Sequence, residues 1–323
     1  MKIKSSLLKY ASALLVGLMS TTITCAQELP KVIKMVVPFA PGASNDLFAR
    51  ALAQKLSTKL ELTIVIENKP GAGGVIGADF VAKAAPDGAT LLFTSNALTT
   101  TAAVQRKLPY DPAKDLAPIA MVANSGLILL VRTDGPYSDT ATLIQAMRDP
   151  KNKMTYGSSG IGSVNHVSTE LLHSMAGTSA LHLPYKGLSL ALIDMIGGRV
   201  DFLITTVASS GSQLRAGKVK ALGVTSLVRS PFNPELAPMA EVVPGYSSEI
   251  WWGVFAPAAT PKSIVERLNA EIRQVTSEPD MQKLFAQEAA LATNLSATDF
   301  AQRINTEIAL WKKVVQERNI QPE

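Results

Sequence analysis

The stretch 32–48 (VIKMVVPFAPGASNDLF) decides the fold, because a strand, a loop and a helix follow one another within it. The apolar run 32–37 is typical of a strand buried in a sheet. The loop 38–44 carries the turn formers proline and glycine. We expect a helix to begin near Asn45, with Ser44 or Asn45 capping it through a side-chain oxygen. Its expected apolar stripe consists of Leu47, Phe48, Ala51, Leu52 and Leu56.

The same order continues along the chain. The stretches 62–67 (LTIVIE) and 89–94 (ATLLFT) predict two more strands, separated by the turn-rich loop 68–74 (NKPGAGG) and a helix. This β-α-β-α-β order predicts a parallel sheet covered by helices on both faces. The pattern restarts after residue 126, which predicts a second sheet. Its expected strands are 127–131, 154–157, 200–204 and 219–225, and its expected helices are 139–147, capped by Ser138 or Asp139, and 163–175.

The last part of the chain adds a strand and amphipathic helices. The stretch 250–256 (IWWGVFA) predicts a hydrophobic strand, in which Trp251 and Trp252 point to opposite faces. One of them should pack in the core; the other either does the same, which is commoner, or lines a ligand cleft. A helix should start at Thr260-Pro261. The stretch 296–318 predicts a single helix with a capping-box pattern at its start.

The first 26 residues have the pattern of a leader. Lys2, Lys4 and Lys9 give a positive start, the run 7–19 is largely apolar, and small residues end in Thr24-Cys25-Ala26. This order predicts a secretory signal peptide, 1–26, and a periplasmic mature protein. The alternative, a retained membrane anchor, needs a run of about 20 apolar residues. Cys25 is the only cysteine. It lacks the neighbours that a lipidation site favours, so we expect a mature chain without disulfides.

Charge and length restrict the class of protein further. The formal net charge of the whole chain is +5, and removal of the leader lysines lowers it. This weak and dispersed charge argues against nucleic acid as a partner. A chain of 323 residues exceeds what one hydrophobic core usually supports, so two α/β lobes are expected.

Two loops rich in glycine and hydroxyl side chains each connect a strand to a helix. They are 39–46 (FAPGASND) and 157–163 (GSSGIGS), and the second leads into a helix with Asn165 and His166. A helix start offers free N–H groups and the positive end of the helix dipole, which suit an anion. Ligands of open α/β sheets bind beyond the carboxyl ends of the strands, where both loops should lie. The alternative is that each loop is only a capped tight turn.

Enzymatic sites find little support. The stretch 71–77 (GAGGVIG) misses the dinucleotide pattern by one position and is better explained as a tight turn. No Gly-x-Ser-x-Gly elbow is present, and the three histidines lack the spacing of a metal site. Nothing in the spacing selects Ser158 or Ser159 with His166 as a catalytic pair. His166 is interpreted either as a ligand donor or as a buried structural histidine. We therefore expect no catalysis, no cofactor and no metal.

Six stretches together resemble the tripartite tricarboxylate transporter solute receptors, also called Bug proteins. The resemblance implies a type II periplasmic-binding-protein fold, with lobe 1 formed by 27–128 plus 250–323 and lobe 2 by 129–249. It also implies capture of mono-, di- or tricarboxylates, amino-acid-like compounds or aromatic acids for a membrane permease. The matching stretches are 36–50 (VVPFAPGASNDLFAR), 67–92 (ENKPGAGGVIGADFVAKAAPDGATLL), 108–119 (LPYDPAKDLAPI), 183–187 (LPYKG), 216–226 (AGKVKALGVTS) and 255–272 (FAPAATPKSIVERLNAEI).

In that family the ligand lies between the lobes and is held by backbone groups, hydroxyls and water. The residues that the resemblance assigns to the site are Phe39, Ala40, Ala43, Ser44, Asn45 and Asp46, then Ser95 and Asn96, and in lobe 2 Ser158, Ser159, Ser163, His166, Tyr185, Thr205 and Thr206.

Departures from the family pattern bear on the ligand. Ala43 and Ser44 replace glycines, and Asn45 stands where threonine is usual. Thr205-Thr206 replaces an Asp-Asn pair found in many relatives, which removes a partner for an ammonium group. We therefore expect an acid without a nearby amine, such as a dicarboxylic or aromatic acid.

The leading hypothesis is a periplasmic, monomeric binding protein that closes over a small carboxylate and delivers it to the inner-membrane permease subunits of a tripartite tricarboxylate-type transporter. A sensory receptor that presents the closed form to a membrane kinase is an alternative. A secreted hydrolase is a third hypothesis, and it predicts turnover of esters or amides.

Overall fold

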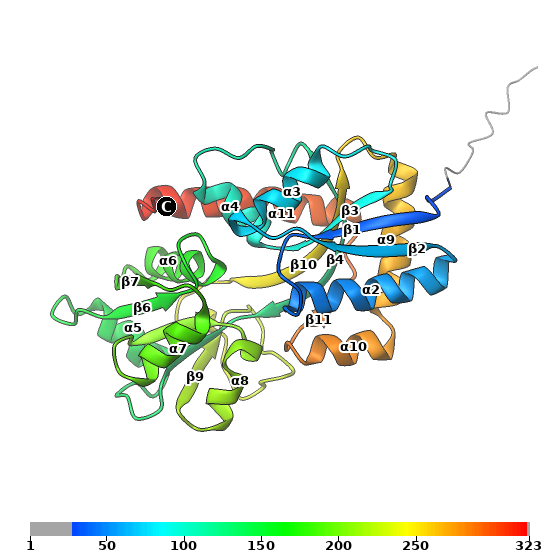
Figure 1. The fold of residues 1–323 in the computed structure, drawn as a ribbon. Coiled ribbons are helices and arrows are strands. Elements are labelled where there is room, and N and C mark those ends of the chain that lie inside the picture. Colours follow the sequence, from blue (N-terminus) through cyan, green and yellow to red (C-terminus); the bar gives the residue numbers. More distant parts are fainter. Residues whose placement is uncertain (1–27, 322–323) are drawn as a thin grey trace, which may run out of the picture.

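The computed structural model describes residues 28–321 (Figure 1). The expected signal peptide, 1–26, with Cys25, lies outside these residues. Among the described residues, no helix combines the length and apolar character needed to cross a membrane.

The strands and helices alternate through most of the chain. The strands are β1 (Val32–Val37), β2 (Thr63–Asn68), β3 (Thr90–Ser95), β4 (Leu116–Gly126), β5 (Ile128–Arg132), β6 (Thr155–Ser158), β7 (Leu181–Pro184), β8 (Phe202–Thr205), β9 (Val219–Val224), β10 (Glu249–Pro257) and β11 (Leu291–Ala292). The helices are α2 (Ser44–Leu60), α3 (Val75–Ala82), α4 (Ala97–Val104), α5 (Thr140–Arg148), α6 (Val164–Ala176), α7 (Leu188–Ile196), α8 (Val207–Arg215), α9 (Lys262–Thr276), α10 (Pro279–Ala286) and α11 (Ala297–Glu317), with 3-10 turns η1 (Ala72–Gly74) and η2 (Met239–Glu241).

The strands form two sheets. The six-stranded sheet has the order β11-β4-β10-β3-β1-β2, and the five-stranded sheet has the order β7-β6-β8-β5-β9. We call the six-stranded sheet with its helices the first lobe and the five-stranded sheet with its helices the second lobe; Figure 1 shows them side by side. In both, three parallel strands are followed by an antiparallel strand that arrives from the other lobe, β10 in the first and β5 in the second.

The expected parallel sheet is therefore only partly correct. The strands β1, β2 and β3 pair in parallel as predicted. β10 runs antiparallel to both of its neighbours, β3 and β4, because it enters the sheet from the second lobe. The sequence analysis missed β4, whose Pro118 pairs with Phe255 where the register shifts. A proline lacks the N–H of a regular ladder and is tolerated at such irregularities.

Helices cover both faces of the first sheet, so each face has its own core. Phe48 of α2 packs edge-on against Trp252, with ring centroids 4.9 Å apart, and Trp251 packs against Phe300 of α11 at 5.3 Å. The two tryptophans do point to opposite faces, but both are fully buried. This burial favours the commoner alternative, in which both tryptophans pack in the core. Leu47, expected in the buried stripe of α2, is exposed.

The two lobes are joined by crossing strands and by one long helix. The chain passes from β4 to β5 through Leu127, whose N–H donates to Thr225 Oγ1 at 2.8 Å. The helix α11 matches the predicted 296–318 closely, and Ser296 caps it by accepting from the Asp299 N–H at 3.1 Å. Its first half buries Phe300 in the first lobe, and its second half buries Trp311 in the core of the second lobe.

Candidate functional site

The loop after β1 ends in an uncapped helix start. The helix α2 begins at Ser44, and Ala43 occupies the N-cap position without a side-chain hydrogen bond. The expectation that Ser44 or Asn45 caps this helix is therefore wrong. Asp46 shapes the loop instead, because its carboxylate accepts from the Gly42 N–H at 3.0 Å.

Asp46 is fully engaged by the protein itself. Its carboxylate also accepts from Arg50 Nε and from Asn68 Nδ2, each at 2.9 Å. Burial raises the pKa of Asp46, but the hydrogen bonds from Arg50, Asn68 and Gly42 outweigh it and lower the pKa below the usual value. Asn68 Nδ2 also donates to the Phe39 carbonyl at 3.1 Å. Asp46 thus fixes the shape of this loop, while Ala40 and Ala43 are exposed.

Ser44 and Asn45 remain available at the start of α2. The Asn45 Oδ1 atom is buried and has no hydrogen-bond partner among the described residues. The neighbouring Ser44 is half-buried. A buried acceptor without a partner costs about 1–3 kcal/mol, so an external donor is expected there.

The loop after β6 is organised differently, because its serines form hydrogen bonds within the second lobe. Ser158 Oγ lies 2.6 Å from His182 Nε2, and Ser159 Oγ donates to Asn165 Oδ1 at 2.9 Å. Ser163 is the N-cap of α6 and donates its hydroxyl to the Gly160 carbonyl at 2.7 Å. This loop therefore offers mainly backbone N–H groups of the helix start, which have no partner within the helix.

A stack of aromatic rings packs against this second loop. The His166 and His182 rings are nearly parallel with centroids 3.9 Å apart, and His182 stacks on Tyr156 at 4.8 Å. His166 Nδ1 accepts from the Gly162 N–H at 3.1 Å. Burial lowers the pKa of His166 and of His182 to about 4, so both rings are neutral at pH 7. These contacts favour the structural interpretation of His166.

Asn96 and Tyr185 are also held by bonds within the protein. Asn96 is buried and donates from Nδ2 to the Glu249 carbonyl at 3.1 Å. The Ser95 side chain accepts weakly from the Ala97 N–H at 3.4 Å. The Tyr185 hydroxyl donates to Asp194 at 2.8 Å. Ser95 and Asn96 stand directly before α4, so they occupy a further helix start of the first lobe.

Thr205 and Thr206 differ sharply although they are neighbours. Thr206 caps α8 by accepting from the Ser209 N–H at 3.1 Å. Thr205 is completely buried, and its Oγ1 atom has no hydrogen-bond partner among the described residues. Thr205 Oγ1 and Asn45 Oδ1 are thus two orphaned buried oxygens, one from each lobe, at positions that the sequence analysis assigned to the site.

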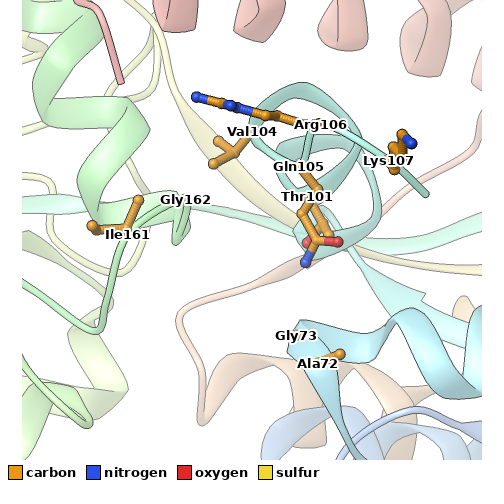
Figure 2. A pocket seen from close by; sticks show the side chains of 9 residues that line it. All are labelled: Ala72, Gly73, Thr101, Val104, Gln105, Arg106, Lys107, Ile161 and Gly162. Atoms are coloured by element: carbon orange, nitrogen blue, oxygen red, sulfur yellow. The ribbon is translucent and has the colours of Figure 1, made fainter. Parts of the chain in front are cut away.

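A cavity of about 520 Å³ lies between the lobes beside the second loop (Figure 2). Its volume lies within the range of small-molecule pockets. Gly162 closes one side against α4, since a Cβ at Gly162 would come within 3.2 Å of Val104. No residue assigned to the site by resemblance lines it. The lining residues are Ala72, Gly73, Thr101, Val104, Gln105, Arg106, Lys107, Ile161 and Gly162.

The polar side chains that line this cavity are the neutral Thr101 and Gln105 and the basic Arg106 and Lys107. Figure 2 shows Thr101 and Gln105 pointing toward Ala72 and Gly73, while Arg106 extends away from them. The Arg106 guanidinium donates to Gln321 Oε1 at 3.0 Å. Sequence reasoning described 71–77 only as a turn and assigned nothing to 101–107, so it missed this cavity.

Two α/β lobes, each receiving one strand from the other, define the class of periplasmic binding proteins. Structures of that class superpose on the chain over most of its length. R. palustris Rpa4515, solved with adipate, has a TM-score of 0.77 and 34% identity, covering 90% of this chain and 98% of that one. MatC from Rhodopseudomonas palustris, solved with bound malate, has a TM-score of 0.73 and 31% identity, covering 88% of this chain and 98% of that one.

The sequence comparisons identify the family. A protein encoded in the tcbD–tcbE intergenic region of Pseudomonas sp. strain P51 is 37% identical over 305 residues, which cover 93% of this chain and 91% of that protein. The family described as Tripartite tricarboxylate transporter family receptor matches residues 48–320. The chain belongs to this family, which confirms the resemblance found in the sequence.

Among the described residues, no group of three or more His, Cys, Asp or Glu side chains could hold a metal ion.

Proposed function

We propose that the protein captures a small organic carboxylate between its two lobes in the periplasm and delivers it to the inner-membrane subunits of a tripartite tricarboxylate-type permease. It acts as a monomer without catalysis, and its lobes correspond to 27–128 plus 250–323 and to 129–249. Membership of the receptor family supports this function, as do the adipate and malate bound by similar proteins.

The observation that carries the proposal is the pair of orphaned oxygens, Asn45 Oδ1 and Thr205 Oγ1. Each sits beside a helix start, α2 in the first lobe and α8 in the second. Helix starts attract carboxylates without a buried cation, and neutral dipoles cost less to desolvate in an empty cleft than a charge does. A ligand that reaches both lobes would give both oxygens a partner. The Thr205 hydroxyl can donate to a carboxylate, whereas the Asn45 amide oxygen only accepts and needs a water molecule or a donor group of the ligand.

The energies are sufficient for a transport receptor. A micromolar dissociation constant requires about 8 kcal/mol. Charge-assisted hydrogen bonds contribute roughly 1.5–3 kcal/mol each, so four or five of them suffice after the cost of association. Because such a ligand contacts both lobes only when they close, it shifts the open–closed equilibrium toward the closed form.

A thermal-unfolding screen of the mature protein tests the proposal. Adipate, malate and benzoate should raise the melting temperature in a saturable manner, whereas uncharged adipamide should not. A ligand at 100 times its dissociation constant adds about 2.7 kcal/mol of stability. Failure of every carboxylate in a wider panel to shift the melting temperature would refute the function. Turnover of ester or amide substrates would favour a hydrolase instead.

A further inference from the structure

Glu307 of α11 is an acidic residue in the interior that the proposed site does not use. Its carboxyl accepts three hydrogen bonds: from the Thr99 hydroxyl at 2.7 Å, from Trp251 Nε1 at 2.8 Å and from Trp311 Nε1 at 3.1 Å. All three donors are neutral. Burial raises the pKa of Glu307 above its usual value, although these hydrogen bonds lower it. An acid removed from water is costly unless donors reach its oxygens, and here three do.

The three donors belong to both lobes. Thr99 lies on α4 and Trp251 on β10, both in the first lobe. Trp311 stands one turn further along α11, and its ring is buried in the core of the second lobe. Figure 1 shows the C-terminal end of α11 beside α6 of that lobe. Glu307 therefore lies where α11 passes from one lobe to the other, and its carboxyl is an acceptor that the two lobes share.

Beside this carboxyl, α11 is separated from the segment that crosses between the lobes. A cavity of about 470 Å³ is lined by residues 247–249, which lead into β10, and by side chains of α11 that include Glu307 and Trp311. Arg303 of α11 pairs with Glu249 at 2.8 Å, but such partly exposed ion pairs contribute little. A close-packed interior resists rotation, whereas this space allows the crossing segment to shift relative to α11.

The residues that bind Glu307 also hold a residue assigned to the ligand site by resemblance. The Asn96 N–H donates to the Trp251 carbonyl at 3.2 Å, and the Thr99 hydroxyl lies 2.8 Å from the Asn96 carbonyl. Asn96 directly precedes α4, so these bonds fix the start of that helix. Glu307 thus reaches the first-lobe half of the site through Thr99 and Trp251.

We propose that Glu307 is a positioning residue for ligand capture, whose carboxyl is the fixed point about which the second lobe closes on the first. The inference rests on the proposed function and adds the residue that guides closure. Without this shared acceptor, the lobes adopt a wider range of relative orientations. A smaller fraction of molecules then presents both halves of the site correctly, and the apparent affinity falls by that fraction.

The variant Glu307→Gln tests this role, because glutamine keeps the size but has one acceptor oxygen and a donating amide group. Thr99 and Trp311 share Oε1, whereas Trp251 binds Oε2, so glutamine opposes an N–H donor on one side. Calorimetric titration uses whichever of adipate, malate and benzoate binds the wild type. The affinity of Glu307→Gln should be lower by about tenfold, the effect of one charge-assisted hydrogen bond.

A distance measurement separates positioning from simple loss of stability. Dyes on Lys151→Cys in the second lobe and Lys283→Cys in the first report the distance between the lobes by single-molecule energy transfer. Both lysines are exposed, and the described chain contains no cysteine. Without ligand, the distribution of distances should be broader in Glu307→Gln than in the wild type.

A matched control changes an acid that serves one lobe alone. Asp201 accepts from the Thr155 N–H at 2.7 Å and from the Thr155 hydroxyl at 3.0 Å, at the start of β6. Asp201→Asn should lose stability but keep the affinity and the narrow distribution of the wild type. Thr99→Val removes one donor at nearly constant volume, and its affinity should fall by roughly threefold, the effect of a neutral hydrogen bond.

The two proposals fail in different ways. Unchanged affinity and unchanged width in Glu307→Gln, or equal losses of affinity in Glu307→Gln and Asp201→Asn, overturn the role of Glu307 and leave carboxylate capture intact. If Glu307→Gln does not fold, wild-type affinity and width in Thr99→Val have the same meaning. If no carboxylate of a wider panel binds the wild type, the proposed function is overturned, and the role of Glu307 in capture with it.

Discussion

The loops after β1 and after β6 have similar compositions but different structures. In the second loop Ser158, Ser159 and Ser163 all bond within the lobe, and a stack of neutral imidazoles packs beneath them. In the first loop the helix start is uncapped, and Asn45 keeps a buried oxygen without a partner. A loop of glycines and serines between a strand and a helix can therefore either satisfy its polar side chains within the protein or leave a polar atom without a partner.

The largest expected effect concerns acid and the histidine stack of the second lobe. Burial lowers the pKa values of His166, His173 and His182 to about 4, compared with about 6.5 in an unfolded chain. Between these two pH values the unfolded state therefore binds more protons than the folded state. The contribution of the neutral rings to stability is fully present above about pH 6.5 and is lost as the pH falls toward 4. Urea unfolding should show a loss of roughly 2–3 kcal/mol for each buried ring across this interval.

The neighbouring charges sharpen this test. Glu170 and Arg318 pair at 2.6 Å beside the stack, and Tyr156 donates to Glu170. This pair stays ionised above pH 4.5, because the hydrogen bonds from Tyr156 and Arg318 outweigh burial and lower the Glu170 pKa. The variant His182→Phe, which keeps a stacked ring, should show a smaller acid loss. A flat stability profile between pH 7 and 4.5 would contradict the description of these rings as buried and neutral.

Of the two loops, the first should show the larger effect on ligand binding. Asn45→Ala should lower the affinity for the bound carboxylate by about tenfold, since one hydrogen bond is worth about 1 kcal/mol or more when it relieves a buried orphan. Its unliganded stability should change little. Ser159→Ala, which breaks the bond to Asn165, is expected to lose stability more than affinity. The reverse pattern in calorimetry and urea unfolding would exchange the roles assigned to the two loops.

Removal of the serine hydroxyl at each of the two helix starts compares the loops directly. Ser163→Ala should cost about 1 kcal/mol of stability, because its side chain caps α6. Ser44→Ala should cost less than half of that, since Ser44 caps nothing. Thermal unfolding of both variants without ligand measures the difference. Equal losses would mean that the start of α2 is capped in solution.

The sequence located the elements that it predicted, but it did not predict all of them and it did not give their partners; β4, β7, β11, α4, α7, α8 and α10 were missed. Most predicted strands and helices lie within two residues of those observed, for example α6 and α11, because apolar periodicity and capping residues are local signals. The long strand β4 was missed, since Pro118 and its mixed polarity obscure the pattern. The antiparallel direction of β10 depends on a chain crossing that no local pattern records.

The site was predictable only as a set of candidates. Family resemblance selected Asn45 and Thr205, but their orphaned oxygens emerge only from the folded packing. The same resemblance selected Asp46 and Ser163, which the protein uses to shape its own loops.

The smallest expected effect on stability leads to the most direct test of the account. Thr205→Val replaces the orphaned hydroxyl by a methyl group of similar size, so the unliganded protein should unfold at nearly the same urea concentration or slightly higher. Calorimetric titration of one carboxylate into wild type, Thr205→Val and Asn45→Ala then asks whether both lobes hold one ligand. We expect each variant to lose about tenfold in affinity. Full affinity in either variant, with normal binding to the wild type, would contradict the two-lobe site.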